Sequence, residues 1–255
     1  MVITLTQGLL ITLAVLIISI DSNLEGFFLF RPIIVAPIVG AILGDLNTGL
    51  VAGGLVELAF AGVTPVGGVV PPNAIMAAVM TVVLAKRTGI TVQAAFTLAY
   101  PFGLLMQYVN TLACTFYSGF NRTADKYAKK ADIHGLFKLC GWGIVIGSLL
   151  YGIVCFLSVY ALQDQMSQLV DMMPAWLTNG LSVAGGVIPA VGFAMLLRVM
   201  LKPKYVPYLI AGFLFATYIN ISNIMPVALM GLAFALIAYY RDDEKEGAEN
   251  NGEGI

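Results

Sequence analysis

The chain has 255 residues, of which 59% are hydrophobic and 11% charged, and its mean hydropathy is +0.90. Soluble domains carry about 25% charged residues, so this composition excludes an ordinary water-exposed fold and predicts an integral membrane protein. The net charge of −1, without a basic stripe along the sequence, excludes nucleic-acid binding as an expected function.

Apolar runs of about 20 residues predict membrane-spanning helices along most of the chain. The first run, 4–20, follows no basic residue and ends without a small-residue cleavage site, so it is interpreted as a retained membrane segment. Run 71–85 is short for a span, and run 91–117 is long and contains Pro101. The other candidates, in chain order, are 27–44, 139–161, 205–219 and 224–240.

Two apolar segments, 44–70 and 176–201, are rich in glycine and proline and are expected to form broken or re-entrant helices. In a bilayer, irregular backbone persists only where protein or a wet cavity surrounds it. The two segments also contain a similar short motif, GGVVP at 67–71 and GGVIP at 185–189. Paired broken segments are typical of transporters built from repeats, which raises the hypothesis of an internal repeat.

Charged segments indicate the domain boundary and the orientation. Residues 241–255 hold six acids and two bases, so we predict one all-α, polytopic membrane domain over 1–240, followed by an acidic, disordered tail. By the positive-inside rule, the basic segments 122–138 and 198–204 are cytoplasmic and the acidic connection 162–175 is external. This order of crossings returns the tail to the cytoplasm.

The Lys86-Arg87 pair does not fit this orientation. It would be external if 91–117 crosses the membrane once, which breaks the positive-inside rule. Either the run bends at Pro101, or the pair of bases is tolerated on the external side.

Glu57 is the strongest candidate for a functional side chain. It lies in the apolar segment GGLVELAFAG, with no opposite charge nearby in the sequence. An intramembrane carboxylate is costly, so it tends to face a cavity or a partner group. Two interpretations stay open: Glu57 accepts hydrogen bonds from the hydroxyl groups of a substrate, or from loose backbone N–H groups of a broken helix.

Amide side chains are the next candidates, because each offers a donor and an acceptor to a hydroxyl-rich ligand. Asn73 closes the glycine-rich segment that carries Glu57, and Gln107 and Asn110 lie three residues apart on one helical face. Amides also join membrane helices to one another, so both interpretations stay open. The remaining candidates, near the second glycine-rich segment and between the last two spans, are Asn179, Asn220 and Asn223.

Structural or gating roles are expected for a second group of residues. Asp45 precedes a predicted helix in the manner of an ordinary N-cap. Asp21 and Glu25 flank a short turn and are predicted to be solvated. The glycines assigned to this group, which allow close approach or irregular backbone, are Gly53, Gly54, Gly185 and Gly186.

Nothing in the sequence indicates self-contained catalysis. His134, the only histidine, lies among bases in the segment 122–138 and is interpreted as solvated. The three cysteines match no metal-site or redox spacing and are interpreted as packing residues. With no P-loop or metal-ligand cluster either, we expect no catalytic residue, no metal and no cofactor.

Several short motifs follow one another along the chain. The first half carries five elements in order: Arg31-Pro32, GAILGD at 40–45, Thr48-Gly49, Gly53-Gly54 with Glu57, and Pro72-Asn73. The second half adds TNGLSVAGG at 178–186 and GFLFATYINISN at 212–223. Together these motifs resemble the IIC subunits of the mannose/fructose/sorbose phosphotransferase transporters. The phrases LVELAFAGVTPVGGVVPPN, MPAWLTNG and PYLIAGFLF look most like the N-acetylgalactosamine and galactosamine members.

The resemblance implies a function and a set of partners. It implies a sugar-binding and sugar-translocating subunit of a phosphoenolpyruvate-dependent system in the bacterial inner membrane, with an amino sugar as substrate. A IID membrane subunit would complete the channel, in a higher oligomer of IIC–IID pairs, and cytoplasmic IIA and IIB subunits would pass a phosphoryl group along histidines to the sugar. The lack of an activated histidine in this chain agrees with that division of labour.

Two other classes of function remain. An ion-coupled secondary transporter would use an intramembrane carboxylate such as Glu57 to bind H⁺ or Na⁺. A docking subunit, for example for a bacteriocin, would rely on its external loops, which are short in this chain.

Overall fold

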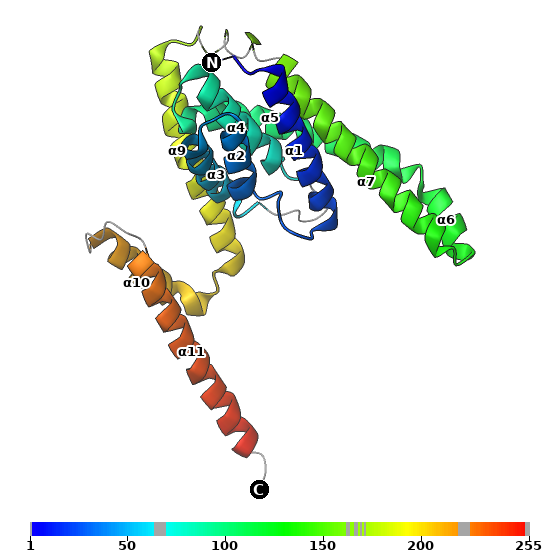
Figure 1. Ribbon diagram of the computed structural model, residues 1–255. Helices are drawn as coiled ribbons and strands as arrows, with labels where there is room; N and C mark the ends of the chain where they lie inside the picture. Colours follow the sequence, from blue (N-terminus) through cyan, green and yellow to red (C-terminus); the bar gives the residue numbers. More distant parts are fainter. Residues whose placement is uncertain are drawn as a thin grey trace. The chain divides into compact units, whose positions relative to one another are not determined.

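The computed structural model describes residues 2–63, 70–161, 164–165, 168, 170, 172–218 and 225–252, with side chains described as far as 240. Within these ranges the regular secondary structure is helical and contains no strand (Figure 1). This confirms the all-α prediction. The chain divides into two compact units, Met1–Leu196 and Leu197–Ile255, and each is described by itself.

Unit 1 is built around one fully buried helix. Every residue of α4 from Ile75 to Ala85 is buried, as expected for a helix that is apolar on all sides. Helices α2, α3 and α5 pack against it, and α1 packs against α7. The helices of this unit are α1 (Leu5–Leu24), α2 (Pro32–Ile42), α3 (Leu46–Phe60), α4 (Ala74–Thr88), α5 (Val92–Ser118), α6 (Asn121–Lys129), α7 (Ile133–Phe156) with the π-helical turn η1 (Leu157–Ala161), and α9 (Ala175–Met200) as far as Leu196.

Helices α2 and α3 form a short antiparallel hairpin with nearly touching backbones. A Cβ atom on Gly40 would lie 2.8 Å from Gly49 Cα, and one on Gly49 would lie 2.7 Å from the carbonyl oxygen of Ala36. Gly44 makes the turn with φ +72°, a conformation that suits glycine. The two helices have 11 and 15 residues, so neither reaches the roughly 20 residues of a full span.

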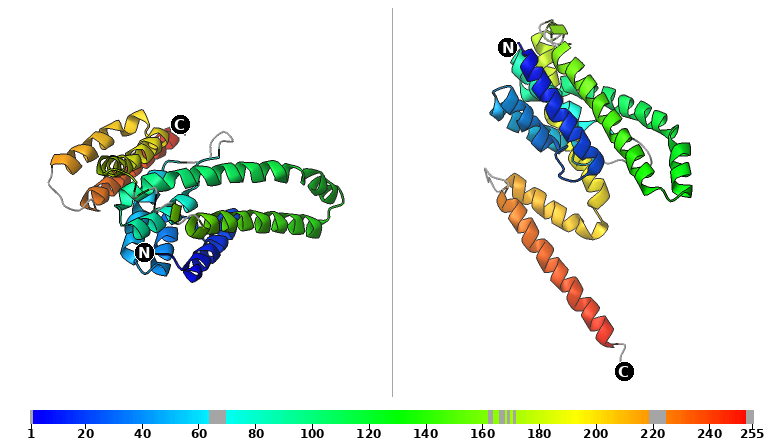
Figure 2. Two further views of the ribbon diagram at one scale, coloured as in Figure 1. Left: turned by 90° about the horizontal axis from the view of Figure 1, so that it is seen from above. Right: turned by 45° about the vertical axis from the view of Figure 1, so that its right-hand side comes forward.

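Helices α5 and α7 lie side by side and continue beyond α1–α4 to α6, which joins them (Figures 1 and 2). Large apolar side chains on this extension, including Phe116, Phe137 and Trp142, are exposed. Helix α5 passes through Pro101 without interruption. By length and hydropathy, three helical stretches within the described residues could cross a membrane: Leu5–Leu24, Ile133–Ala161 and Ala175–Met200.

The expectation of broken helices is not confirmed. Helix α3 runs unbroken over Leu46–Phe60 and α9 over Ala175–Met200, although both contain several glycines. The physical reason is that Gly49 and Gly53 of α3 and Gly185 and Gly192 of α9 accommodate neighbouring backbone instead of breaking their own helix. The repeat is not confirmed either, because residues 67–69 lie outside the described part of the chain and Gly185–Pro189 is ordinary helix.

Unit 2 contains the short helix η2 (Pro203–Tyr205), α10 (Val206–Tyr218) and α11 (Met225–Gly252), which follow the end of α9. Helix α11 continues past residue 240, so residues 241–252 are helical where the composition predicts disorder. Glu, Lys and Ala are good helix formers, and extending an existing helix avoids the cost of nucleation. The boundary at 240 and the cytoplasmic side of this end stay predictions.

The structure explains how the Lys86-Arg87 pair is accommodated. Lys86 Nζ lies 3.1 Å from Asp45 Oδ2, and Arg87 Nη2 lies 2.6 Å from Asp164 Oδ1. Each base is therefore paired with a carboxylate, and one partner belongs to the connection 162–175. The end of α4 therefore lies beside a residue of the segment predicted to be external. The two ion pairs offset the positive charges of Lys86 and Arg87, so the bases can be accommodated on that side.

The glycines of α9 give a direct test of its packing on α5. A Cβ atom on Gly185 would overlap the carbonyl oxygen of Gln93, whereas one on Gly186 would meet no atom of the described residues within 4 Å. We expect Gly185→Ala to lower the free energy of unfolding by about 1–3 kcal/mol. Gly186→Ala is the matched control and should be neutral or slightly stabilising, because alanine is the better helix former. Thermal unfolding of the purified protein in detergent measures both, and equal effects would contradict this packing.

Candidate functional site

A polar cavity of about 290 Å³ lies in unit 1, where several helix ends meet. Its size is close to the lower end of the roughly 300–1,000 Å³ range of small-molecule pockets. Its charged lining residues are Arg31 and Glu57, and its amides are Asn73 and Asn110. The remaining walls are formed by Ser22, Phe30, Pro32, Phe60, Val63, Val70, Pro71, Pro72, Ala74 and Ile75.

Glu57 is held between the side chain and the backbone of α2. Arg31 Nη2 donates to Glu57 Oε1, and the backbone N–H of Ile33 donates to Glu57 Oε2 at 3.3 Å. Arg31 is the N-cap residue of α2 but makes no side-chain cap, and Pro32 has no N–H to donate. Glu57 therefore caps α2 from a neighbouring helix, where the positive end of the helix dipole favours an anion. Its side chain is 15% exposed and borders the cavity. The carboxylate thus accepts from a backbone N–H, while a role in binding substrate hydroxyl groups stays a prediction.

Asn73 is fixed by its own backbone and side chain. Its Oδ1 accepts from the backbone N–H of Met76 at 3.0 Å, so it is the N-cap of α4. Its backbone N–H donates to the carbonyl oxygen of Gly103 at 3.0 Å, which ties the start of α4 to α5. Its Nδ2 donates to Tyr151 Oη at 2.7 Å. The capping role is thus present in the structure, in a residue that also lines the cavity.

The two amides of α5 take different positions. Asn110 lines the cavity, and its Nδ2 donates to Tyr151 Oη at 2.8 Å. Gln107 instead donates its Nε2 to the carbonyl oxygen of Val70 and holds the chain that leads into α4. The structure therefore brings Glu57, Asn73 and Asn110 to one cavity, with Gln107 supporting its wall.

Asp21 is a residue whose role the sequence did not reveal. Its prediction as a solvated carboxylate is wrong, since it is only 6% exposed. It accepts from the backbone N–H groups of Phe27 at 2.8 Å and Leu29 at 2.6 Å. These bonds hold a tight turn in which Glu25 and Phe28 have positive φ values of 49° and 58°. The turn delivers the chain to Arg31, so Asp21 stabilises the entrance to α2.

Arg31 was also missed as a site residue. It stands 26 residues before Glu57, and no local spacing rule connects the two. The available signal was the Arg31-Pro32 element of the family pattern, combined with the cost of leaving an intramembrane carboxylate unpaired.

Other predicted residues lie elsewhere. Asp45 caps α3 at the other end of the α2–α3 hairpin, where it accepts from the backbone N–H of Thr48 at 3.1 Å. That hydrogen bond, followed by the pairing with Lys86, holds the pKa of the Asp45 carboxyl below its usual range. Asn179 is exposed on α9 and is not among the residues that line the cavity. The last two candidates, Asn220 and Asn223, lie outside the described residues.

The four glycines divide into two pairs. Gly53 and Gly185 face neighbouring backbone: a Cβ atom on Gly53 would lie 3.1 Å from the carbonyl oxygen of Pro32, and Gly185 faces Gln93. A Cβ atom on Gly54 or Gly186 would meet no atom of the described residues within 4 Å. Gly53 and Gly185 are therefore required for close packing and Gly54 and Gly186 are not, while a gating role stays a prediction for all four.

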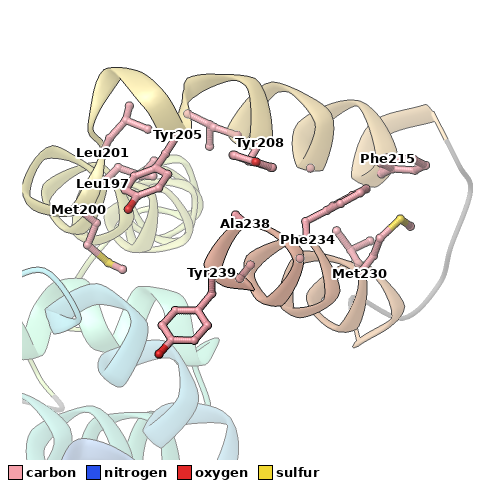
Figure 3. Close-up of a pocket in the computed structure, with 15 residues that line it drawn as sticks. Leu197, Met200, Leu201, Tyr205, Tyr208, Phe215, Met230, Phe234, Ala238 and Tyr239 are labelled. Carbon is pink, nitrogen blue, oxygen red and sulfur yellow. The ribbon is translucent and has the colours of Figure 1, made fainter. Parts of the chain in front are cut away.

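A second, larger cavity of about 760 Å³ lies within unit 2, between α10, α11 and the end of α9 (Figure 3). Aliphatic, aromatic and methionine side chains line it, and its polar side-chain atoms are the hydroxyl groups of Tyr205, Tyr208 and Tyr239. Among the described residues, none that lines it carries a carboxylate or amide side chain for a hydroxyl-rich ligand. The cavity of unit 1 is thus the better candidate for a polar substrate.

Metal binding has no support in the described part of the chain, where no three His, Cys, Asp or Glu side chains come together. His134 is exposed near the start of α7, away from the residues that line the cavity. The geometry therefore describes a helical membrane protein with a cavity that includes an ion pair and two amides in its lining.

Comparison with known proteins agrees with this class. Residues 5–237 match the family described as the PTS system sorbose-specific IIC component. The chain is 51% identical over 247 residues to N-acetylgalactosamine permease IIC component 1 of Escherichia coli K12, covering 97% of this chain and 92% of that protein. It is 29% identical over 255 residues to the sorbose-specific EIIC component of Lacticaseibacillus casei, covering 100% of this chain and 92% of that protein.

Solved structures show the same fold. One described as the structure of a membrane protein superposes with a TM-score of 0.84 at 26% identity, covering 93% of this chain and 96% of that one. A cryo-EM structure of the mannose transporter ManYZ with microcin E492 matches with a TM-score of 0.59 at 26% identity, covering 94% of this chain and 97% of that one. The chain therefore belongs to the phosphotransferase-system IIC family and is a sugar permease subunit, which confirms the resemblance in its sequence.

Proposed function

We propose that this subunit binds and translocates N-acetylgalactosamine, or a closely related amino sugar, in a phosphoenolpyruvate-dependent phosphotransferase system. The observation that carries the proposal is the cavity in which Glu57, Asn73 and Asn110 converge between two apolar walls. The choice of sugar is supported by the 51% identity to an N-acetylgalactosamine permease component.

The cavity has the chemistry that a monosaccharide needs. The carboxylate of Glu57 and the amide of Asn110 can hydrogen-bond to sugar hydroxyl groups. Phe30 and Phe60 provide apolar surface for the C–H face of the ring. Because Arg31 already pairs with Glu57, the site is neutral overall and suits an uncharged sugar better than a free cation.

The position of the cavity supports release toward the cytoplasm. It lies at the start of α4, while the Lys86-Arg87 pair lies at the other end of that helix, roughly 20 Å away at 1.5 Å per residue. If the connection 162–175 is external, as the charge pattern predicts, the cavity lies nearer the cytoplasmic side of the inner membrane. A sugar bound there would be within reach of a cytoplasmic phosphoryl donor.

Partners are part of the proposal. The chain's one histidine is exposed and lies outside the cavity, so the phosphoryl group would come from IIA and IIB subunits. A IID membrane subunit would cover apolar faces such as that of α7, where Trp142 and Leu149 are exposed. We propose a higher oligomer of IIC–IID pairs, with the C-terminus in the cytoplasm and the basic segment 122–138 as the docking face for the soluble subunits.

A reconstituted uptake assay tests this function. Proteoliposomes containing this chain with IID, supplied with IIA, IIB and phosphoenolpyruvate, should accumulate labelled N-acetylgalactosamine as its phosphate. Omitting IID or IIB should abolish accumulation. Accumulation of unmodified sugar, driven by an imposed ion gradient without the soluble subunits, would instead establish an ion-coupled transporter.

Glu57 provides a sharper test of the site. We expect Glu57→Gln to raise the KM for sugar by about 10- to 100-fold, because a hydrogen bond to a charged group is worth about 1.5–3 kcal/mol. The amount of assembled complex should stay near the wild-type level, since glutamine keeps the shape and an acceptor oxygen for Ile33. Glu25→Gln, at an exposed carboxylate on a turn, is the matched control and should leave the KM unchanged. An unchanged KM in Glu57→Gln, together with lost assembly in Glu57→Ala, would reduce Glu57 to a capping role.

A further inference from the structure

Tyr151 is a buried polar residue directly behind the cavity. It lies on α7, is 7% exposed, and its hydroxyl oxygen accepts from Asn73 Nδ2 at 2.7 Å and Asn110 Nδ2 at 2.8 Å. Both amides line the cavity, whereas Tyr151 does not. One phenol therefore joins the two amides of the site through their NH₂ groups.

This arrangement fixes which end of each amide is available. The Oδ1 of Asn73 accepts from the backbone N–H of Met76, and its Nδ2 donates to Tyr151. These two hydrogen bonds together fix the orientation of the Asn73 amide. Asn110 has its Nδ2 on the same hydroxyl oxygen, and no described residue donates a hydrogen bond to its Oδ1, so this oxygen is the end of the amide left for a ligand. An Asn without such a partner can turn its amide and present either a donor or an acceptor.

We propose that Tyr151 is a positioning residue that makes Asn110 present its carbonyl oxygen to the ligand, and so favours sugars that carry an N–H group. The N–H of an acetamido group can only donate, whereas a hydroxyl group can donate or accept. A cavity with a fixed acceptor at Asn110, next to the carboxylate of Glu57, therefore matches an N-acetylated sugar. This inference rests on the proposed function and deepens it by naming a residue that sets the choice of sugar.

The test compares two sugars in the reconstituted complex. Tyr151→Phe removes the hydroxyl and keeps the ring, and it should raise the KM for N-acetylgalactosamine about tenfold, the value of one hydrogen bond. The maximal rate should stay within about twofold, and the KM for galactose, which carries a hydroxyl in place of the N–H, should change less than threefold. An equal change for both sugars, or no change for either, would overturn the proposal.

A double-mutant cycle shows whether Tyr151 acts through Asn110. In an Asn110→Ala background, Tyr151→Phe should cause no further change in the KM for N-acetylgalactosamine. Independent, multiplicative effects of the two substitutions would overturn the positioning role.

The matched control is Tyr117→Phe. Tyr117 lies on α5 and donates its hydroxyl to the carbonyl oxygen of Gly143 on α7 at 2.9 Å, so it joins the same two helices away from the cavity. Its loss should leave the KM of both sugars unchanged, and a selectivity change equal to that of Tyr151→Phe would overturn the proposal. If the wild-type complex phosphorylates neither sugar, the proposed function fails. If the wild-type complex is active and Tyr151→Phe has the same selectivity between the two sugars, only the positioning role of Tyr151 fails.

Discussion

The backbone contact between α2 and α3 determines where the carboxylate of this protein can lie. Gly49, Gly53 and Glu57 are spaced four residues apart and share one face of α3. Gly49 meets α2 at Ala36 and Gly40, and Gly53 meets it at Pro32, so the next residue on that face reaches the start of α2. There Glu57 finds Arg31 and the N–H of Ile33. A larger side chain at Gly49 would separate the helices and draw the Glu57 carboxylate away from Arg31 and Ile33, which is costly for a charge within the membrane.

The same contact accounts for the shape of the site. Because the hairpin is shorter than a span, its open end, at the start of α2 and the end of α3, leaves room beside the start of α4 within unit 1, and the cavity forms there. Asp21 fixes the turn that enters α2, while Asn73 fixes the start of α4 and links it to α5 and α7. Glu57 and Asn73 are thus anchored by backbone hydrogen bonds at helix ends, and Asn110 is held by the hydroxyl of Tyr151.

Composition and apolar run length were enough to predict an all-α membrane protein, and the motifs at 30–73 indicated the family. Helix ends were less predictable. The apolar run 27–44 begins at residue 27, but the helix within it begins only at Pro32, because the residues before Pro32 form the turn held by Asp21. The glycines suggested breaks, but the structure uses Gly49 and Gly185 for packing, which depends on partners distant in the sequence. Arg31 and Tyr151 stayed hidden for the same reason, since Tyr151 meets Asn73 across 78 residues.

The central claim is that sugar binds between Glu57 and Asn110 in the cavity of unit 1. An experimental structure of the complex with N-acetylgalactosamine tests it most directly. The account predicts density for one sugar ring with hydroxyl groups within hydrogen-bonding distance of the Glu57 carboxylate and the acetamido N–H facing Asn110 Oδ1. Sugar density in the apolar cavity of unit 2, or an Arg31–Glu57 pair that contacts no ligand, would contradict it.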